Sequence, residues 1–478
     1  MPLFLNIILT ALYIVLFVGT ILFILSDEKT VAVKLSWIII ISLLPAVGLI
    51  LYYLLGFNFR RSFAFQRNHS NYIEYLKENY PEVLGKLWDR HTGDEIPEYA
   101  ELAELFSKGG AAKPLPADDV TIYTDGQFKL EELMDDIRSA KKYIHMEYFY
   151  FRKGEMGDKF KELLMQKARE GVKVRFIHEN IANFDISPRY VNEMRKAGVE
   201  VIKFTPVLSA LILLPFRLNY RDHRKIAIID GKIGYSGGMN ISDDYYRFWR
   251  DTHYRMTGKA VSSLQAAFID SYITSGGKMD TPVEELFPYL NDSHEGSILT
   301  QTVPGDPDSR WPILTHGTNW ILFHTKKYIW LQTPYFLPPE SLLSAIKTAA
   351  LKGADVRLML PRKTDIIFTT MANRGYYKEC LDAGIKLYLK DGKFIHSKTL
   401  VTDDNLAMIG SANLDLRSLD LSYEMNTYFY DECVADQCKA VFEDDLKECT
   451  ELTLEEWKKI SAIRKFIWNI ARLLSPIL

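Results

Sequence analysis

The sequence carries the same short pattern twice, and this duplication limits the folds that the chain can adopt. Residues 223–230 read His-Arg-Lys-Ile-Ala-Ile-Ile-Asp and residues 396–403 read His-Ser-Lys-Thr-Leu-Val-Thr-Asp, so both have the form H-x-K-x4-D. The second copy follows the first by 173 residues, and the same offset pairs Gly237 with Gly410, Asn240 with Asn413, and Asp251 with Glu424. Because solenoid repeats span only about 20–50 residues, so long an offset indicates two duplicated lobes rather than a repeat array.

Each lobe is expected to be an α/β unit. Ahead of the first copy, stretches typical of strands alternate with stretches typical of helices: strands over 120–123, 143–151 and 172–178, helices over 129–140 and 156–170. The run Lys-Lys-Tyr-Ile at 141–144 returns at 326–329, and Gly-Val-Lys-Val-Arg at 171–175 returns as Gly-Ala-Asp-Val-Arg at 353–357. We therefore predict two lobes, each a mixed sheet flanked by helices, facing each other about a pseudo-twofold axis.

Two apolar runs precede the lobes. Residues 3–25 and 35–57 contain no charged side chain, and each run is long enough to cross a hydrocarbon layer of about 30 Å as a helix. A cleaved signal peptide is the alternative for the first run, but no basic residue precedes it and a second apolar run follows at once. Arg60, Arg61 and Arg67 follow the second run. The sequence therefore predicts a two-helix transmembrane hairpin with both ends in the cytoplasm.

These features divide the chain into five parts. Breaks rich in proline and charge, such as Pro304-Gly305-Asp306-Pro307, guide the boundary between the lobes. The predicted parts are two transmembrane helices within 1–59, a connector over 60–115, a first lobe over 116–290, a second lobe over 291–455 and a basic amphipathic helix over 456–478.

Composition excludes several functions. Among 478 residues, 58 Lys and Arg face 61 Asp and Glu, so the net charge of −3 argues against a nucleic-acid-binding protein. The four cysteines contain no C-x-x-C pair, which makes a disulfide scaffold or a zinc site a poor interpretation. The sequence shows no Asp-rich or His-rich metal cluster, and we expect chemistry without metal or cofactor.

The two H-x-K copies suit the transfer of a phosphodiester group. Alternate side chains of a strand share one face, so each His and its Lys project together. One histidine, attacking phosphorus, would form a phosphohistidine, while the other would protonate the leaving alkoxide. Lys225 and Lys398, with Asn240, Ser411 and Asn413, would hold the phosphate oxygens. Because the copies are nearly symmetric, their spacing does not decide whether His223 or His396 is the nucleophile.

The acids of the pattern call for two interpretations. Asp230 lies seven residues beyond His223, about 23 Å along an extended strand, so Asp230 and likewise Asp403 are expected in turns, as structural parts of the catalytic motif. The later acids are better partners for the imidazoles, because a carboxylate that accepts the Nδ1 proton leaves Nε2 free to attack. We predict that Asp251 orients His223 and that Glu424 orients His396.

The two copies with their Gly-Gly-Met-Asn and Gly-Ser-Ala-Asn tails resemble the phospholipase D superfamily. More narrowly, the runs 219–225, 237–241, 248–253, 332–338 and 410–415, together with the double apolar run, resemble the bacterial cardiolipin synthases. One departure is Gly238, which stands where the second copy has Ser411. The resemblance implies that two phosphatidylglycerol molecules give cardiolipin and glycerol at the bacterial inner membrane. It favours His223 as the nucleophile.

Two further stretches are consistent with a lipid substrate. Residues 207–216 form an apolar stretch beside His223, which is either a lip that dips into the bilayer or a buried core helix. In the tail, Ile463, Phe466, Ile470, Leu473 and Ile477 recur at helical spacing among basic residues, as in a helix that binds anionic lipid or one that packs on the domain. A phospholipase D-type hydrolase, or a transferase with another alcohol as acceptor, remains the alternative activity. The sequence leaves the oligomeric state open.

Overall fold

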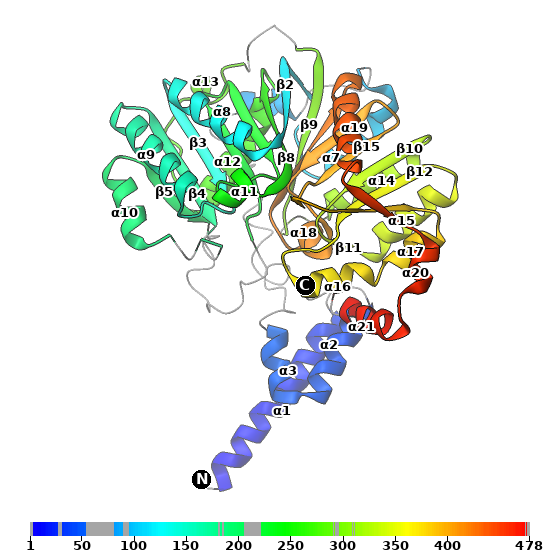
Figure 1. Cartoon of the computed structure of the whole chain (residues 1–478). Coiled ribbons are helices and arrows are strands. Elements are labelled where there is room, and N and C mark those ends of the chain that lie inside the picture. Colours follow the sequence, from blue (N-terminus) through cyan, green and yellow to red (C-terminus); the bar gives the residue numbers. More distant parts are fainter. Residues whose placement is uncertain are drawn as a thin grey trace.

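The computed structural model describes residues 3–26, 31–53, 81–88, 95–179, 182–183, 186–204, 221–289, 291, 296–307, 309, 311–473 and 475. Two large mixed sheets make up most of this part of the chain, and Figure 1 shows them side by side with helices on their outer faces. The apolar stretch predicted over 207–216 lies outside the described residues, as does most of the predicted connector before residue 95.

The first lobe is built on an eight-stranded sheet in the order β14-β8-β7-β6-β3-β4-β5, with β2 also paired to β8. Strands β3, β4 and β5 run parallel, whereas β6, β7 and β8 continue the sheet as antiparallel neighbours. The bounds are β2 Asp119–Asp125, β3 Tyr143–Tyr148, β4 Lys173–Glu179, β5 Glu200–Phe204, β6 Lys225–Ile229, β7 Ile233–Gly237 and β8 Trp249–Thr257.

The second lobe repeats this topology in a nine-stranded sheet ordered β1-β9-β18-β16-β15-β10-β12-β13-β19. Strands β10, β12 and β13 are parallel, and β15, β16 and β18 are antiparallel, as their counterparts are in the first lobe. The bounds are β9 Ile298–Gly305, β10 Tyr328–Gln332, β12 Asp355–Pro361, β13 Lys386–Lys390, β15 Thr399–Thr402, β16 Leu406–Gly410, β18 Glu424–Tyr430 and β19 Cys449–Leu452. A separate pair joins β11 Phe336–Leu337 to β17 Leu414–Asp415.

Amphipathic helices cover the sheets. Most of these helices bury an apolar face, because burying that face is what stabilises a short helix in a protein. The first lobe carries α8 Gly126–Ser139, α9 Glu155–Arg169, α10 Pro188–Lys196, α11 Asp243–Arg247, α12 Val261–Thr274 and α13 Val283–Leu286. The second carries α14 Ile313–His324, α15 Glu340–Leu351, α16 Ile367–Arg374, α17 Tyr377–Asp382, α18 Leu416–Asp420 and α19 Glu432–Leu446.

A shared core joins the lobes. Leu264 and Phe268 of α12 pack in one cluster with Val434 and Phe442 of α19, together with buried residues from both sheets. The strands and helices that we predicted before the first copy are confirmed as β2, α8, β3, α9 and β4, and the α/β class with two lobes is confirmed with them. Their boundaries differ from the predicted ones by a few residues, as is usual at element ends.

Two short strands cross between the lobes. Strand β1, Leu115–Ala117, precedes the first lobe in sequence but pairs with β9 of the second sheet. Strand β14, Phe394–Ile395, comes from the second lobe and pairs with β8 of the first. The helix α7, Ala100–Lys108, also packs on the second lobe, where the Phe106 ring lies 4.5 Å from the Tyr428 ring. Each sheet therefore includes a short strand from outside the stretch of sequence that forms the rest of it.

The amino-terminal runs form three helices rather than two. The first run is α1 Leu3–Ser26, but the second is divided into α2 Val31–Leu43 and α3 Pro45–Leu51. Leu44 leaves the helical conformation at φ −127° and ψ 68° because Pro45, whose ring disfavours a helical residue before it, begins the next helix. In the described part of the chain, no helix has both the length and the apolar character needed to cross a membrane. Among the described residues, the second run over 35–57 is therefore two helices rather than one, and residues 54–57 lie outside the description.

The remaining described elements are short. Before α7 lie α6 Pro81–Leu87 and the 3-10 turn Pro97–Tyr99. After β19 the chain forms α20 Leu454–Lys459 and α21 Ala462–Leu473. Figure 1 shows α21 at the end of the molecule from which the amino-terminal helices extend.

Candidate active site

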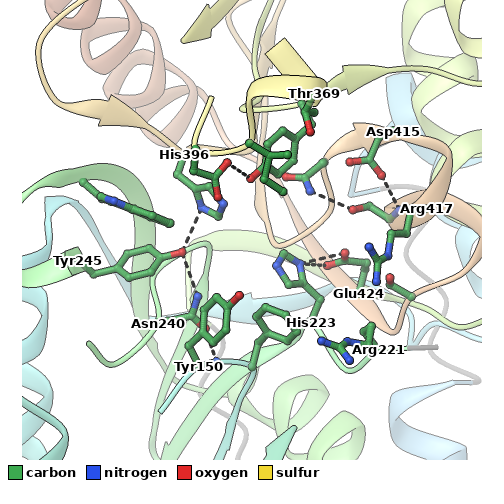
Figure 2. A pocket seen from close by; sticks show the side chains of 18 of the residues that line it. Tyr150, Arg221, His223, Asn240, Tyr245, Thr369, His396, Asp415, Arg417 and Glu424 are labelled. Atoms are coloured by element: carbon green, nitrogen blue, oxygen red, sulfur yellow. Dashed lines mark hydrogen bonds and ion pairs between the residues drawn. The ribbon is translucent and has the colours of Figure 1, made fainter. Parts of the chain in front are cut away.

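A cavity of about 420 Å³ lies where the two lobes meet. Both pattern histidines reach it, and Figure 2 shows His223 and His396 on different sides of the space. The other lining residues come from both lobes: Phe149, Tyr150, Arg152, Arg221, Asn240, Ser242, Asp244, Tyr245 and Trp249 from the first, and Tyr335, Leu337, Asp365, Ile366, Thr369, Asn413, Asp415, Arg417, Ser418, Ser422 and Glu424 from the second. The duplication therefore contributes one imidazole from each lobe to a single site.

The backbone of each histidine is held by the opposite lobe. The His223 N–H donates to the Tyr423 carbonyl oxygen at 2.8 Å, and the His396 N–H donates to the Arg250 carbonyl oxygen at 2.7 Å. Tyr423 directly precedes Glu424, and Arg250 directly precedes Asp251. These reciprocal contacts are what a twofold relation between the lobes produces, and they bring the acid of one lobe beside the histidine of the other.

The acids are consequently exchanged relative to our prediction. His223 Nδ1 lies 3.0 Å from a Glu424 carboxylate oxygen, and His396 Nδ1 lies 2.8 Å from Asp251 Oδ2. The predicted pairs, Asp251 with His223 and Glu424 with His396, were wrong because they assumed that an acid serves its own lobe. Both carboxylates accept at Nδ1, so Nε2 of each ring is left for chemistry.

The Gly238 departure has a steric explanation. A Cβ at Gly238 would lie 2.1 Å from Asp251 Oδ1, so the position has no room for a side chain. In the second lobe the longer Glu424 is paired with a serine instead, and the Ser411 hydroxyl donates to Glu424 Oε2. Ser411 thus holds the acid of its own lobe, and it is not among the cavity-lining residues. We therefore assign Ser411 to Glu424 rather than to a phosphate oxygen.

The lysines lie behind the histidines in buried positions. Lys225 Nζ donates to the His223 carbonyl oxygen at 2.5 Å, whereas Lys398 Nζ lies 2.6 Å from His396 Nδ1 and 3.7 Å from Asp251 Oδ2. Burial lowers the pKa of Lys225 to about 7 and the pKa of Lys398 to about 8, because an ammonium group is poorly solvated there. Both amines therefore titrate near neutral pH.

The histidines and their acids also have shifted pKa values. Burial, followed by Lys398, lowers the pKa of His396 to about 3, and burial with Lys225 and Lys398 holds the pKa of His223 well below its usual range. Burial raises the pKa of Glu424 to about 7. Burial pushes the pKa of Asp251 upward too, but Lys398 and the His396 contact outweigh it, and the pKa lies below its ordinary value. Both imidazoles are therefore neutral in the empty site, and Asp251 is ionised.

The predicted amides line the cavity. Asn240 Nδ2 donates to the Tyr245 hydroxyl at 2.9 Å, and that hydroxyl lies 3.1 Å from His396 Nδ1. Asn413 Nδ2 donates to Ser418 at 3.1 Å, and its Oδ1 has no hydrogen-bond partner among the described residues. Tyr245 and Ser418 are themselves separated by the pattern offset of 173, so the sequence contained a signal for Tyr245 that we did not use.

Asp230 and Asp403 lie in turns at the ends of the pattern strands. Asp230 has φ 53° and accepts hydrogen bonds from the N–H groups of Lys141, Lys142 and Tyr143 at 2.8–2.9 Å. Asp403 has φ 50° and accepts from the N–H groups of Lys326, Lys327 and Tyr328. The expected turns are confirmed. Each aspartate joins the H-x-K pattern to the repeated Lys-Lys-Tyr-Ile run.

Sequence reasoning missed the charged and aromatic walls of the cavity. Tyr150 repeats as Tyr335 at the same offset that relates Lys141 to Lys326, a signal that we did not use. Arg221, Tyr335 and Asp415 fell inside runs that we quoted only for the resemblance, and Arg417 lies just beyond them. Burial raises the pKa of Asp415 to about 6. No group of three or more His, Cys, Asp and Glu side chains arranged to hold a metal ion occurs in the described part of the chain, and metal-free chemistry remains a prediction.

Two duplicated α/β lobes that share one cavity, with an H-x-K pair from each, define the phospholipase D-like class of proteins. The family profile "Cardiolipin synthase, PLD-like domain" matches residues 133–270 and 321–446, and "Phospholipase_D-nuclease N-terminal" matches residues 11–56. The chain belongs to the cardiolipin synthase family, which confirms the resemblance.

Relatives agree with this placement over nearly the whole length. The chain is 36% identical to "Cardiolipin synthase 2" of Bacillus anthracis, over 96% of this chain and 89% of that one. It is 35% identical to "Cardiolipin synthase" of Staphylococcus aureus strain Mu50, over 99% and 98% of the two chains. The phosphatidylserine synthase structure from Haemophilus influenzae shares the fold, with a TM-score of 0.59 at 14% identity, covering 79% of this chain and 100% of that one.

Proposed function

We propose that the chain transfers a phosphatidyl group between two phosphatidylglycerol molecules, giving cardiolipin and glycerol. The observation that carries the proposal is the pair of crossed contacts, His223 with Glu424 and His396 with Asp251, around one cavity. Two imidazoles whose Nδ1 atoms face carboxylates fit a two-step transfer, in which one forms a covalent bond and the other moves protons. The names of the relatives supply the substrate class.

In the first step, His223 Nε2 attacks phosphorus of the first phosphatidylglycerol. The bond from phosphorus to the glycerol headgroup breaks, and His396 donates a proton to the departing alkoxide. In the second step, a hydroxyl of another phosphatidylglycerol attacks the phosphohistidine, its proton goes to His396, and the phosphorus–nitrogen bond breaks. The resemblance and the Asp251 carboxylate beside His396 Nδ1, which favours the protonated ring, support His396 as the proton carrier.

The substrate's own charge matters in this scheme. In the empty site the pKa of His396 is low because of burial and Lys398, so its protonated form is disfavoured. A bound phosphodiester brings negative charge beside the lysines and imidazoles, and this favours their protonated forms. Arg221 and Arg417 line the same cavity and suit the phosphate of the second phosphatidylglycerol.

One assay separates this transfer from its alternatives. Purified protein is incubated with phosphatidylglycerol labelled in the headgroup and in the acyl chain. We expect cardiolipin and glycerol; phosphatidic acid with glycerol would instead indicate a hydrolase, and a new phosphatidyl alcohol in the presence of added alcohol would indicate a broader transferase. Trapping the intermediate and mapping the adduct tests the nucleophile, and an adduct on His396 would reverse the two roles.

We further propose that the chain resides in the bacterial inner membrane as a multi-pass protein with its lobes in the cytoplasm. Helix α1 carries no charged residue, and side chains such as Phe4, Leu12 and Val15 are exposed on it. Arg60, Arg61 and Arg67 follow the apolar runs, as expected for a cytoplasmic flank. Resistance of the full chain to carbonate extraction would support membrane insertion, and release into the soluble fraction would contradict it.

A further inference from the structure

Helix α21 packs on the second lobe with one face and leaves the opposite face uncovered. Trp468 and Ala471 are buried, whereas Ile463 is 73%, Phe466 65% and Leu473 77% exposed. At 100° per residue these exposed side chains, with Ile467 and Ile470, fall in one continuous row. An apolar row of this size on a helix surface indicates a binding face rather than scattered surface residues.

The charged residues of α21 and of the segment just before it are all basic. From Trp457 to Leu478 the sequence contains Lys458, Lys459, Arg464, Lys465 and Arg472 and no acidic residue. By the same helical spacing, Arg464 falls on the side of Trp468 and Ala471 and Lys465 falls next to that side, so both cations lie outside the apolar row. A helix with its apolar row in the acyl layer would therefore place both cations at the level of the lipid headgroups.

The helix α16 connects this face to the cavity. Its amino-terminal end carries Ile366 and Ile367, which are 53% and 80% exposed, and Ile366 also lines the cavity. Its carboxy-terminal end packs on α21, where the Arg374 guanidinium lies 5.1 Å from the centre of the Trp468 ring and Arg472 donates to the Gly375 carbonyl oxygen at 3.2 Å. One short helix therefore links the packed face of α21 to the mouth of the site.

We infer that α21 and the start of α16 form a surface that docks on an anionic bilayer beside the cavity mouth. This docking surface consists of Ile366, Ile367, Ile463, Phe466, Ile467, Ile470 and Leu473. The inference rests on the proposed lipid substrate and adds where that substrate enters, because Ile366 belongs to both the surface and the cavity. The basic flank selects a bilayer of acidic lipids over a neutral one, since each cation near such a surface adds attraction.

Two further features favour a bilayer over a second copy of the chain. The docking surface lies at the end of the molecule from which the amino-terminal helices extend (Figure 1), so the same membrane can meet both. A second copy would bring the same cations of its own tail toward this surface, and like charges repel. Thr369, two residues after the start of α16, also lines the cavity (Figure 2).

Depth-dependent quenching tests the docking without any turnover. The full chain, with the exposed Cys433 replaced by Ser, receives a single Phe466→Cys substitution and an environment-sensitive dye, and is reconstituted into vesicles with spin-labelled lipid. We expect strong quenching in vesicles containing phosphatidylglycerol, and less in phosphatidylcholine alone or at high salt. The matched control is Glu162→Cys on the exposed side of α9, where we expect no quenching.

The outcomes are distinct. If the lipid label does not quench the dye at position 466, the inference is overturned. If the dye is shielded equally in detergent, and the shielding increases with protein concentration, the face binds a second copy and the inference is also overturned. If position 466 is quenched but phosphatidylglycerol is not converted, the docking surface stands and the proposed function fails.

A matched pair of variants tests whether docking delivers substrate. Phe466→Ser is compared with Phe128→Ser, because Phe128 of α8 is similarly exposed, at 69%, but lies in the first lobe. We expect Phe466→Ser to lose about tenfold of its activity on vesicles relative to detergent-dispersed substrate, as expected when one large apolar side chain no longer enters the bilayer. Phe128→Ser should keep the original ratio. Equal ratios for the two variants would overturn the link between docking and delivery.

Discussion

At the scale of single residues, the chemistry depends on which acid contacts which histidine. Glu424 holds the Nδ1 side of His223, and Asp251 holds that of His396, so the two acids serve different steps of the proposed transfer. Removing either carboxylate leaves the fold largely intact but removes the acceptor that orients one ring.

The crossed pairs predict different substrate dependences for two variants. Asp251→Asn should weaken the proton carrier, so we expect a loss of about 10²–10⁴-fold with the glycerol leaving group and a much smaller loss with an activated leaving group such as nitrophenol. Glu424→Gln should reduce adduct formation from both substrates alike. Single-turnover rates with the two substrates measure this, and thermal unfolding serves as the control. The reverse pattern would make His396 the nucleophile and His223 the proton carrier.

The buried lysines and Glu424 predict a bell-shaped pH profile of kcat/KM. Burial lowers the pKa of Lys398 to about 8, so the site loses positive charge as the pH rises past that value. Burial raises the pKa of Glu424 to about 7, so its carboxylate is lost as the pH falls below that value. We expect activity on dispersed substrate to fall on both sides, and Glu424→Gln to remove the acidic limb. A flat profile between pH 6 and pH 9 would contradict both assignments.

Above pH 8, the contribution of Lys398 to the free energy of unfolding should increase while the activity decreases. An unfolded lysine has a pKa of about 10.4, so between pH 8 and that value the unfolded state binds more protons at Lys398 than the folded state does. The lysine's contribution to the free energy of unfolding therefore rises with pH in this window. If activity falls in this pH window while the free energy of unfolding does not, the loss of activity comes from titration of the site and not from unfolding.

Gly238 predicts a steric effect on the neighbouring acid. A side chain at this position would overlap the Asp251 carboxylate, so Gly238→Ser should displace Asp251 from His396. We expect turnover with phosphatidylglycerol to fall at least as far as in Asp251→Asn. Ser411→Gly removes one hydrogen bond to Glu424 without adding bulk, and should be much milder. A fully active Gly238→Ser protein would show that the pocket behind Asp251 can adapt.

At the scale of secondary-structure elements, the motif aspartates anchor loops rather than react. Asp230 satisfies three backbone N–H groups at the start of β3, and Asp403 does the same at the start of β10. The repeated Lys-Lys-Tyr-Ile run is therefore the partner of the motif aspartate.

Asp230→Ala should lower the free energy of unfolding by about 1–3 kcal/mol, because three backbone N–H groups lose their acceptor and alanine is strained at positive φ. Asp230→Asn should cost less, since asparagine tolerates this conformation and keeps one acceptor oxygen. Denaturant titration measures the change, and activity per folded molecule should stay within a few-fold of the unaltered protein. A well-folded but inactive Asp230→Asn protein would require a catalytic role.

At the scale of the whole molecule, the site is assembled without the amino-terminal helices. The lining residues of the cavity all lie between positions 149 and 424, and each histidine is supported by the other lobe. The helices α1, α2 and α3 pack mainly among themselves, in a cluster that includes Trp37, Ile41 and Tyr52.

A protein that begins near residue 60 should therefore keep its chemistry. We expect activity on dispersed phosphatidylglycerol close to that of the full chain. On vesicles we expect weaker, salt-sensitive activity, because the amino-terminal helices are gone and the attraction of the α16–α21 surface is screened over about 8 Å at physiological salt. A folded truncated protein that is inactive on both substrates would mean that the amino-terminal helices shape the site.

The sequence by itself determined the duplication, the α/β class, the two H-x-K pairs and the family, because short motifs and local periodicity carry this information. It also placed Asp230 and Asp403 in turns, since the reach of an extended strand is a local property. Only the tertiary structure decided which acid serves which histidine, that Ser411 holds Glu424, and that β1 and α7 join the second lobe. The physical reason is separation along the chain: the His223–Glu424 contact joins residues 201 positions apart and the His396–Asp251 contact joins residues 145 apart, and no local pattern records how two lobes meet.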